Sequence, residues 1–149
     1  MQIDEKMLES LVGKIVLQVL QQGQERQIAD GVIALSLPQI RVTEEDRMDT
    51  GHPEDIVYTK DLFSLSESPR LGCGIMEMDH TTFDWTLNYD EVDYVIEGTL
   101  SILKNGKKVT ANAGELILIP KGSSIQFQVE DHARFIYVTY PADWENAAN

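Results

Sequence analysis

The sequence predicts an all-β fold, a single β-barrel, preceded by an N-terminal amphipathic α-helix. Apolar residues near the N-terminus recur at three- and four-residue steps, which is the helical period. From residue 31 onward, short runs alternate apolar with polar residues and are separated by turn-forming residues. Two glycine-containing motifs, at residues 91–98 and 114–122, follow such runs and indicate strands that end in tight turns.

The N-terminal helix is predicted over residues 1–22. Its apolar stripe consists of Ile3, Met7, Leu8, Leu11, Val12, Ile15, Val16, Val19 and Leu20. Asp4 and Glu5 suit the positive end of a helix dipole. Residues 21–27 are polar and include Gly23, so the helix is expected to be a separable appendage.

A β-domain is predicted over residues 31–142. Its expected strands are residues 32–37, 71–78, 91–97, 100–104, 108–111, 116–119, 125–129 and 134–140. Asn105-Gly106 predicts a type I′ hairpin, because both turn positions need a positive φ. The polar residues 43–55 are expected to form a long surface loop.

Length and charge limit the classes of function. At 149 residues the chain suits one domain with a core of its own. Its formal net charge of −13 argues against binding to nucleic acid or to an anionic membrane. Cys73 is the single cysteine, so an internal disulfide cannot form, and no segment resembles a signal peptide or a transmembrane helix. A cytoplasmic protein that binds small molecules or proteins is expected.

The two glycine motifs resemble those of the cupin family. The first reads Glu91-Val-Asp-Tyr-Val-Ile-Glu97-Gly98, and the second reads Gly114-Glu-Leu-Ile-Leu-Ile-Pro120-Lys-Gly122. The resemblance implies a jelly-roll barrel with three histidines and a glutamate as metal ligands. By this spacing the histidine positions fall at Asp84, Thr86 and Ile125, so of the four ligands only Glu91 remains.

A pocket can be inferred from the alternation of side chains along the strand. Glu91, Asp93, Val95 and Glu97 share one face, which the motif places inward. Two enclosed carboxyl groups would raise at least one pKa, and such a pair suits acid–base chemistry or Mg²⁺ binding. The expected polar neighbours are Tyr89, Asp84 and Thr86, and the expected opposite apolar wall is Ile125, Phe127 and Val129.

Several of these residues also have plainer interpretations. The carboxyl pair could be a solvated pair on an edge strand, and Tyr89 and Tyr94 could be core or interface residues. Backbone amides near Lys121 could meet a phosphate, although an ordinary turn is favoured. The three histidines are scattered in the sequence, so no histidine metal site and no tightly bound transition metal are expected.

Longer motifs resemble the EutQ family of ethanolamine-utilisation proteins, over about residues 31–142. They are Arg47-Met-Asp-Thr-Gly-His, Val57-Tyr-Thr-Lys-Asp61, Ser68-Pro-Arg-Leu-Gly-Cys-Gly-Ile-Met-Glu-Met78, Trp85-Thr-Leu-Asn-Tyr-Asp-Glu91, Glu97-Gly-Thr-Leu, Ile119-Pro-Lys-Gly-Ser-Ser and Tyr137-Val-Thr-Tyr-Pro141. The resemblance implies a homodimeric cupin associated with a bacterial microcompartment. It also implies acetate kinase activity, which interconverts acetyl phosphate and ADP with acetate and ATP, with Mg²⁺ carrying the nucleotide.

For that activity we expect Glu91, Asp93 and Tyr89 to be catalytic. Asp84, Thr86, Tyr94 and Lys121 are the expected binding residues. Both substrates are anions, so either Mg²⁺ is recruited by Glu91 and Asp93 or basic side chains approach the phosphates. The basic candidates are Lys60, Arg70, Lys121 and Arg134.

The N-terminal helix resembles an encapsulation peptide that docks on shell proteins of a microcompartment, or it packs on the barrel or on a dimer partner. A second hypothesis is therefore a non-catalytic assembly factor that binds shell or cargo proteins. A third, a metal-dependent dioxygenase or isomerase, needs an iron or manganese site that a carboxylate pair without histidine would hold poorly.

Overall fold

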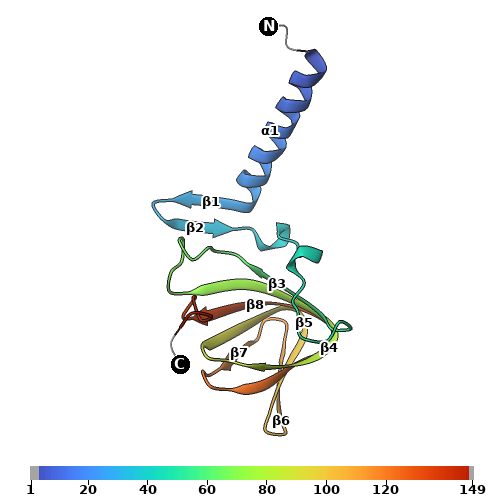
Figure 1. Ribbon diagram of the computed structural model, residues 1–149, viewed down its shortest axis with the longest axis vertical. Helices are drawn as coiled ribbons and strands as arrows, with labels where there is room; N and C mark the ends of the chain where they lie inside the picture. The colour runs from blue at the N-terminus through green and yellow to red at the C-terminus, as the bar shows by residue number, and fades with distance from the viewer. Residues whose placement is uncertain (1–3, 148–149) are drawn as a thin grey trace. The chain divides into compact units, whose positions relative to one another are not determined.

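The computed structural model describes residues 4–147, and for residues 17–25 it describes the backbone alone. The predicted stripe residues Ile3, Val19 and Leu20 therefore lie outside the described side chains. The chain divides into two compact units, residues 1–41 and residues 42–149 (Figure 1).

The first unit contains the predicted helix followed by a small hairpin. Its elements are α1 (Glu5–Glu25), β1 (Arg26–Ala29), β2 (Val32–Leu35) and the short 3₁₀ helix η1 (Leu37–Gln39). The helix is confirmed, but it runs through the polar segment at residues 21–25, where a break was expected. The described side chains of its apolar stripe are exposed, from 46% for Leu8 to 68% for Met7.

Strand β2 differs from the prediction, which placed residues 32–37 in the barrel. It pairs with β1 alone, in a two-stranded antiparallel sheet. The turn between the strands holds Asp30 and Gly31, both with positive φ, as a two-residue hairpin turn requires. The polar sequence Glu-Arg-Gln at residues 25–27 continues the polar segment before it, so the sequence did not predict β1 or the β1–β2 hairpin.

The second unit is a curled antiparallel sheet, in agreement with the predicted jelly-roll class. Its strands are β3 (Ile56–Asp61), β4 (Gly72–Thr86), β5 (Asp90–Lys104), β6 (Lys107–Asn112), β7 (Leu116–Ile119) and β8 (Ser124–Tyr140). They pair in the order β3-β4-β8-β5-β6, and β7 pairs with β5 (Figure 1). One edge of β5 is thus shared by β7 near its start and by β6 near its end.

Most predicted strands are confirmed, and several prove longer than expected. Strand β3 was missed, because its polar Thr-Lys-Asp ending weakens the alternating pattern. The expected loop at residues 43–55 is confirmed apart from a 3₁₀ turn, η2 (Glu44–Asp46). Asn105 and Gly106 both have positive φ, which confirms the β5–β6 hairpin turn.

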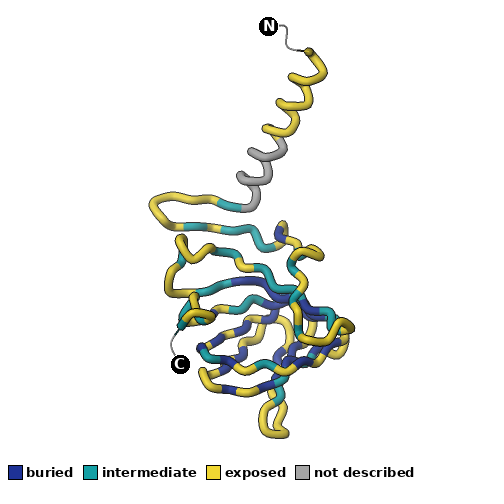
Figure 2. The backbone as a smooth tube through the Cα atoms, in the orientation of Figure 1, coloured by how far each residue is buried: buried dark blue, intermediate teal, exposed yellow. Residues whose placement is uncertain are grey.

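Buried residues recur along the strands of the second unit (Figure 2), and their apolar side chains form one hydrophobic cluster. Phe83, Phe127 and Phe135 stack at its centre, with ring centroids 5.2 Å apart for the first pair and 6.4 Å for the second. The predicted apolar wall of Ile125, Phe127 and Val129 is buried as expected. Across residues 4–147, no helix combines the length and the apolar composition needed to cross a membrane.

Candidate functional site

Strand β5 carries two carboxyl groups into the core. Its alternation buries Glu91 and Asp93, which are 4% and 0% exposed, while Val92 and Tyr94 face outward. Both carboxyl oxygens of Asp93 and Oε1 of Glu91 are buried without a hydrogen-bond partner. Buried polar atoms nearly always have a partner, so this pair is an exception that calls for a functional explanation.

Burial changes the acidity of this pair. The pKa of Asp93 lies well above its ordinary value, because the side chain is desolvated and because the Glu91 carboxyl group stands next to it. Desolvation also raises the pKa of Glu91. The pair therefore retains a proton at a pH at which an exposed carboxyl group has already lost it. This confirms the inward placement that the alternation predicted and excludes a solvated rim pair.

The register of the sheet aligns Asp93 with other polar groups. Asp61 on β3 pairs with Gly74 on β4, Gly74 pairs with Tyr137 on β8, and Tyr137 pairs with Asp93. Residues directly opposite one another share a face of the sheet. This cross-strand row, which runs from Asp61 to Asp93, is continued on β7 by Ile117.

A second row runs beside the first. Gly72 on β4 pairs with Thr139 on β8, which pairs with Glu91. Both glycines leave space for the larger side chain opposite: a Cβ at Gly74 would overlap the Tyr137 hydroxyl, and one at Gly72 would overlap Thr139 Oγ1. The Gly-Cys-Gly sequence thus makes room for two hydroxyl groups beside the carboxyl pair.

Tyr137 uses that room to reach the neighbouring strand. Its hydroxyl donates a hydrogen bond to Asp61 Oδ1 at 2.7 Å. Burial, and then the carboxylate of Asp61, raise the pKa of Tyr137. The phenol consequently stays protonated and serves as a hydrogen-bond donor throughout the physiological range.

Tyr89 immediately precedes strand β5, and its side chain is 4% exposed. Its hydroxyl accepts a hydrogen bond from Trp85 Nε1 at 2.7 Å, which leaves its own proton to point elsewhere. Interaction with this hydroxyl lowers the pKa of Glu91 and partly offsets the effect of burial. Trp144 packs against Tyr89 with ring centroids 4.8 Å apart and against Trp85 at 6.1 Å, so aromatic rings shield this end of the pair.

Glu97 was expected on the inward face, and this placement is wrong. The register between β5 and β8 shifts between Val95 and Glu97, which reverses the faces of the residues that follow. The Glu97 side chain is consequently 63% exposed. A bulge of this kind leaves no periodic mark in the sequence.

Asp84 and Thr86 do not lie on the pocket wall. Both are exposed, and they contact Gln126 and Ser124 on the outer face of β8 at 2.9 and 3.0 Å. The inward positions of this segment belong to Phe83, Trp85 and Leu87, the odd-numbered residues. The spacing counted back from Glu91 was therefore wrong by one residue, which moves a strand residue to the opposite face.

Tyr94 lies on the opposite face of β5 from the carboxyl pair, and Lys121 lies in the turn that follows β7. Tyr94 is 41% exposed on the outer face of β5. The backbone amide of Lys121 donates to Asp90 Oδ1 at 2.8 Å, that of Gly122 to the Leu87 carbonyl at 2.8 Å and that of Ser123 to the Pro120 carbonyl at 3.2 Å. These three amides are occupied, which favours the ordinary turn over a phosphate site built from them.

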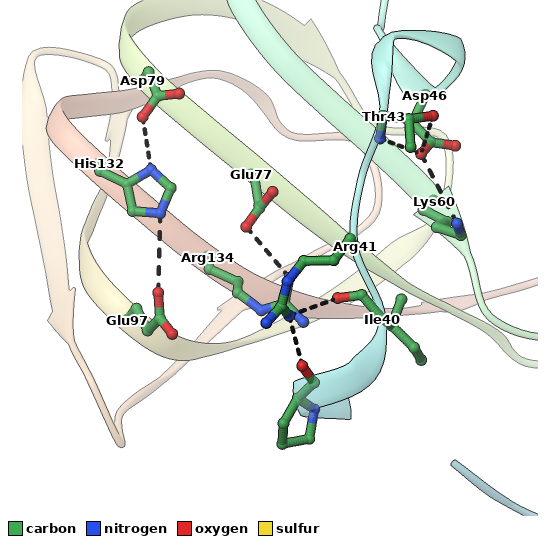
Figure 3. A network of polar contacts seen from close by, with 11 residues as sticks. Ile40, Arg41, Thr43, Asp46, Lys60, Glu77, Asp79, Glu97, His132 and Arg134 are labelled. Carbon is green, nitrogen blue, oxygen red and sulfur yellow. Dashed lines mark hydrogen bonds and ion pairs between the residues drawn. The ribbon is translucent and has the colours of Figure 1, made fainter. Parts of the chain in front are cut away.

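Charged contacts elsewhere on the barrel are structural ion pairs (Figure 3). His132 Nδ1 lies 2.6 Å from Asp79 Oδ1, and its Nε2 lies 4.0 Å from Glu97 Oε2. The guanidinium of Arg134 is buried 3.3 Å from Glu77, and Lys60 lies 4.0 Å from Asp46. Among residues 4–147, no three His, Cys, Asp or Glu side chains gather closely enough to hold a metal ion.

Sequence reasoning missed four residues of this site. Tyr137 and Thr139 belong to it because of the β5–β8 register, which local pattern cannot give. Gly72 and Gly74 were a detectable signal, since glycine inside a strand often marks close approach of another group.

The chain matches the family model described as "Ethanolamine utilisation protein EutQ" over residues 3–146. It is 58% identical over 148 residues to a Clostridioides difficile protein named "Acetate kinase EutQ", and the match covers 95% of this chain and 94% of that protein. A Salmonella typhimurium protein of the same name is 41% identical over 100 residues, which cover 67% of this chain and 43% of that protein.

Solved structures agree with this assignment. The structure of the Clostridium difficile EutQ protein matches with a TM-score of 0.80 and 65% identity, over 83% of this chain and 90% of that one. The cupin domain of Schizosaccharomyces pombe Cnp3 matches with a TM-score of 0.56 and 15% identity, over 76% and 77% of the two chains. The latter likeness shows the fold alone, and it confirms the predicted cupin class.

Proposed function

Because the chain belongs to the EutQ family of ethanolamine-utilisation proteins, we propose that it interconverts acetyl phosphate and ADP with acetate and ATP. The name of the Clostridioides difficile relative supports this activity. In the forward direction the bond between phosphorus and the acetyl oxygen breaks, and a bond forms between phosphorus and a β-phosphate oxygen of ADP. Acetate leaves as a carboxylate.

The observation that carries the proposal is the buried, unpartnered carboxyl pair. A pair of this kind that retains a proton does not repel an anion and donates a hydrogen bond to it. Glu91 is the more exposed member of the pair, at 4% against 0% for Asp93, so it is assigned the contact with the acetyl group. Asp93 is fully enclosed beside Glu91 and retains its proton, while Tyr89 orients the Glu91 carboxyl group.

Mg²⁺ enters this proposal with the nucleotide rather than as a resident ion. Oxygen donors suit Mg²⁺, but the ion keeps several water molecules and needs space for them. Asp93 is completely buried, and desolvation favours a proton on the pair over two full negative charges. Glu91 and Asp93 therefore do not suit a resident Mg²⁺ site, which favours the alternative in which Mg²⁺ arrives with the nucleotide.

The test is ATP formation from acetyl phosphate and ADP with added Mg²⁺, by wild-type protein and variants purified identically. Glu91→Gln should reduce turnover by about 10²-fold or more, the usual loss of a proton-donating group. Asp84→Asn is the matched control, since Asp84 is an exposed carboxylate on β4 and its loss should change nothing.

Two results would contradict the proposal. Unchanged turnover in both Glu91→Gln and Asp93→Asn would remove the pair from the chemistry. Equal background activity in wild type and variants would trace ATP formation to a contaminating kinase, and the assembly hypothesis would then take its place.

The exposed helix of the first unit favours that second function. Six apolar side chains of α1 are about half exposed or more: Met7, Leu8, Leu11, Val12, Ile15 and Val16. Such a stripe suits a groove on a partner protein. We propose that this stripe binds shell or cargo proteins of a microcompartment. Such binding would also explain how an enzyme that uses acetyl phosphate stays near its substrate.

A further inference from the structure

A cavity of about 310 Å³ opens between the β5–β6 hairpin and β7. It lies where the curled sheet is not closed, because β6 and β7 both pair with β5 and not with each other. The residues that line it are Ile102, Lys104, Asn105, Lys107, Val109, Ile117, Leu118, Ile119, Pro120, Ser123 and Ile125. Of the residues expected from sequence to line the pocket, Ile125 is among them, whereas Glu91, Asp93 and Lys121 are not.

The walls of this cavity are apolar and firmly held. Ile102, Ile117, Ile119 and Ile125 are each at most 6% exposed and belong to the core cluster. Val109 is 59% exposed and stands opposite Ile102, so it forms the accessible side. Pockets of this size with apolar walls and few polar groups are typical of small-molecule sites.

The rim of the cavity is basic. Lys104 and Lys107 are direct partners across the β5–β6 hairpin, a placement that costs free energy because like charges repel. Lys104 Nζ donates to Ser123 Oγ at 3.0 Å, which holds this ammonium group against the cavity. Ser123 itself is 1% exposed and donates to the Pro120 carbonyl.

Neither ammonium group is neutralised within the described part of the chain. No carboxylate among the described side chains makes an ion pair with Lys104 or Lys107, although the protein has a net charge of −13. The adjacent Lys108 differs, since its Nζ lies 3.6 Å from Glu130. A bound anionic ligand would neutralise the charges of Lys104 and Lys107.

We propose that this cavity binds the nucleoside phosphate, with the base between the apolar walls and the phosphates at Lys104 and Lys107. The proposal rests on the proposed kinase function and names the nucleotide site for it. A flat heteroaromatic base suits walls of branched aliphatic side chains, whereas the methyl group of an acetyl phosphate would leave most of the volume empty. Ammonium groups bind phosphate oxygens through charge-assisted hydrogen bonds.

The cavity and the carboxyl pair share a wall. Ile119 pairs with Glu91 and Ile117 with Asp93, so the two cavity-lining isoleucines stand directly beside the two carboxyl groups. In this arrangement the acidic and the basic side chains contact different parts of the substrates. The carboxyl pair faces the acetyl group, and the lysines face the phosphates, which removes the conflict between anionic substrates and an acidic site.

The test is calorimetric titration of ADP into the full-length protein, without Mg²⁺ or acetate. The double variant Lys104→Met and Lys107→Met keeps the aliphatic stems and removes both charges, and it should bind ADP about tenfold or more weakly. Lys108→Met is the matched control and should bind like wild type. Val109→Trp should weaken ADP and adenosine alike by filling the cavity, whereas the lysine changes should leave adenosine binding unaltered.

The possible results separate this inference from the kinase proposal. Undiminished ADP affinity in the lysine variant, no ADP binding by wild type, or competition by acetyl phosphate for the cavity would each overturn the nucleotide site. ADP binding that depends on both lysines in a protein without turnover would uphold the site and refute the kinase. Turnover lost in Glu91→Gln, with ADP affinity retained, would uphold both.

Discussion

Gly74 and Tyr137 stand directly opposite each other on β4 and β8, and the tyrosine ring occupies the space that a side chain at position 74 would need. The hydroxyl of Tyr137 crosses this gap to bond Asp61 on β3. Because Gly74 has no Cβ, the phenol ring of Tyr137 can lie in the cross-strand row that runs from Asp61 to Asp93. The residue at position 74 therefore affects where the Tyr137 side chain lies beside the carboxyl pair.

Gly74→Ala should therefore displace Tyr137 and reduce the free energy of unfolding by about 1–3 kcal/mol, the usual cost of overpacking. Urea denaturation measures the loss. The companion substitution Tyr137→Val removes the ring, so the double variant should lose less than the sum of the two single variants. Strictly additive losses would show that the two residues do not compete for space.

The carboxyl pair should make stability depend on pH. Below pH about 4 the pair is protonated in both the folded and the unfolded chain, and its contribution is intact. As pH rises, the unfolded chain releases protons first, because the pKa values of Glu91 and Asp93 are raised in the folded protein. Stability from this pair is then lost until pH has passed the folded pKa values.

Asp93→Asn should flatten that dependence and stabilise the protein at pH 8 relative to wild type. Denaturation curves from pH 4 to pH 9 measure the effect. Asp84→Asn, an exposed change of the same kind, serves as control and should leave the slope unaltered. An equally steep decline in Asp93→Asn would show that the buried pair is ionised without cost.

Tyr89→Phe should raise the pKa of Glu91 further, since the hydroxyl that favours its ionised form is removed. It also leaves Trp85 Nε1, which is partly buried, without its acceptor, which lowers stability by about 1 kcal/mol. Tryptophan fluorescence followed against pH should show its transition at a higher pH than in wild type. A transition at the same pH would exclude Tyr89 as the group that orients Glu91.

The outer face of β5 and β7 should form a homodimer interface. Tyr94 pairs with Leu116 and Val92 with Leu118, and all four side chains are between 37% and 67% exposed. A continuous apolar face suits a second copy related by two-fold symmetry, the commonest arrangement. Light scattering should give a dimer for wild type and a monomer for Leu116→Glu.

Leu65→Glu, which places the same charge at another exposed leucine, should remain dimeric. A monomeric wild type would show that this face is not a contact between copies.

The helix α1 should direct the protein to microcompartments through its apolar stripe. Leu11→Glu with Ile15→Glu should abolish co-localisation of a fluorescent fusion with shell proteins, because charges would enter the contact face. Ser10→Glu, on the polar side of the helix, is the control and should localise normally. Localisation that survives the paired change would assign targeting to another part of the chain.

Much of the fold was accessible from local pattern, and part of the site was not. Alternation along β5 identified the inward placement of Glu91 and Asp93, and Asn105-Gly106 identified a hairpin. The faces of Asp84 and Thr86 were assigned from motif spacing and came out reversed, because one residue of offset changes the face.

Contacts between distant strands explain the rest. Tyr137 joins the site through pairings with β4 and β5, which lie far from it in sequence. Lys104 and Lys107 appear from the sequence as residues on either side of a turn. Their importance arises only when β7 comes near the hairpin and a cavity forms between them.

The pairing of β5 with β8 also bears on the order of folding. Strand β7 follows β5 closely in sequence, whereas β8 follows both and pairs with the other edge of β5, beside Glu91 and Asp93. The two carboxyl groups thus keep water on that side until β8 docks. Mild acid protonates both carboxyl groups before β8 docks, and it is therefore expected to speed this step. The two residues assigned to catalysis thus also affect the folding rate of the chain.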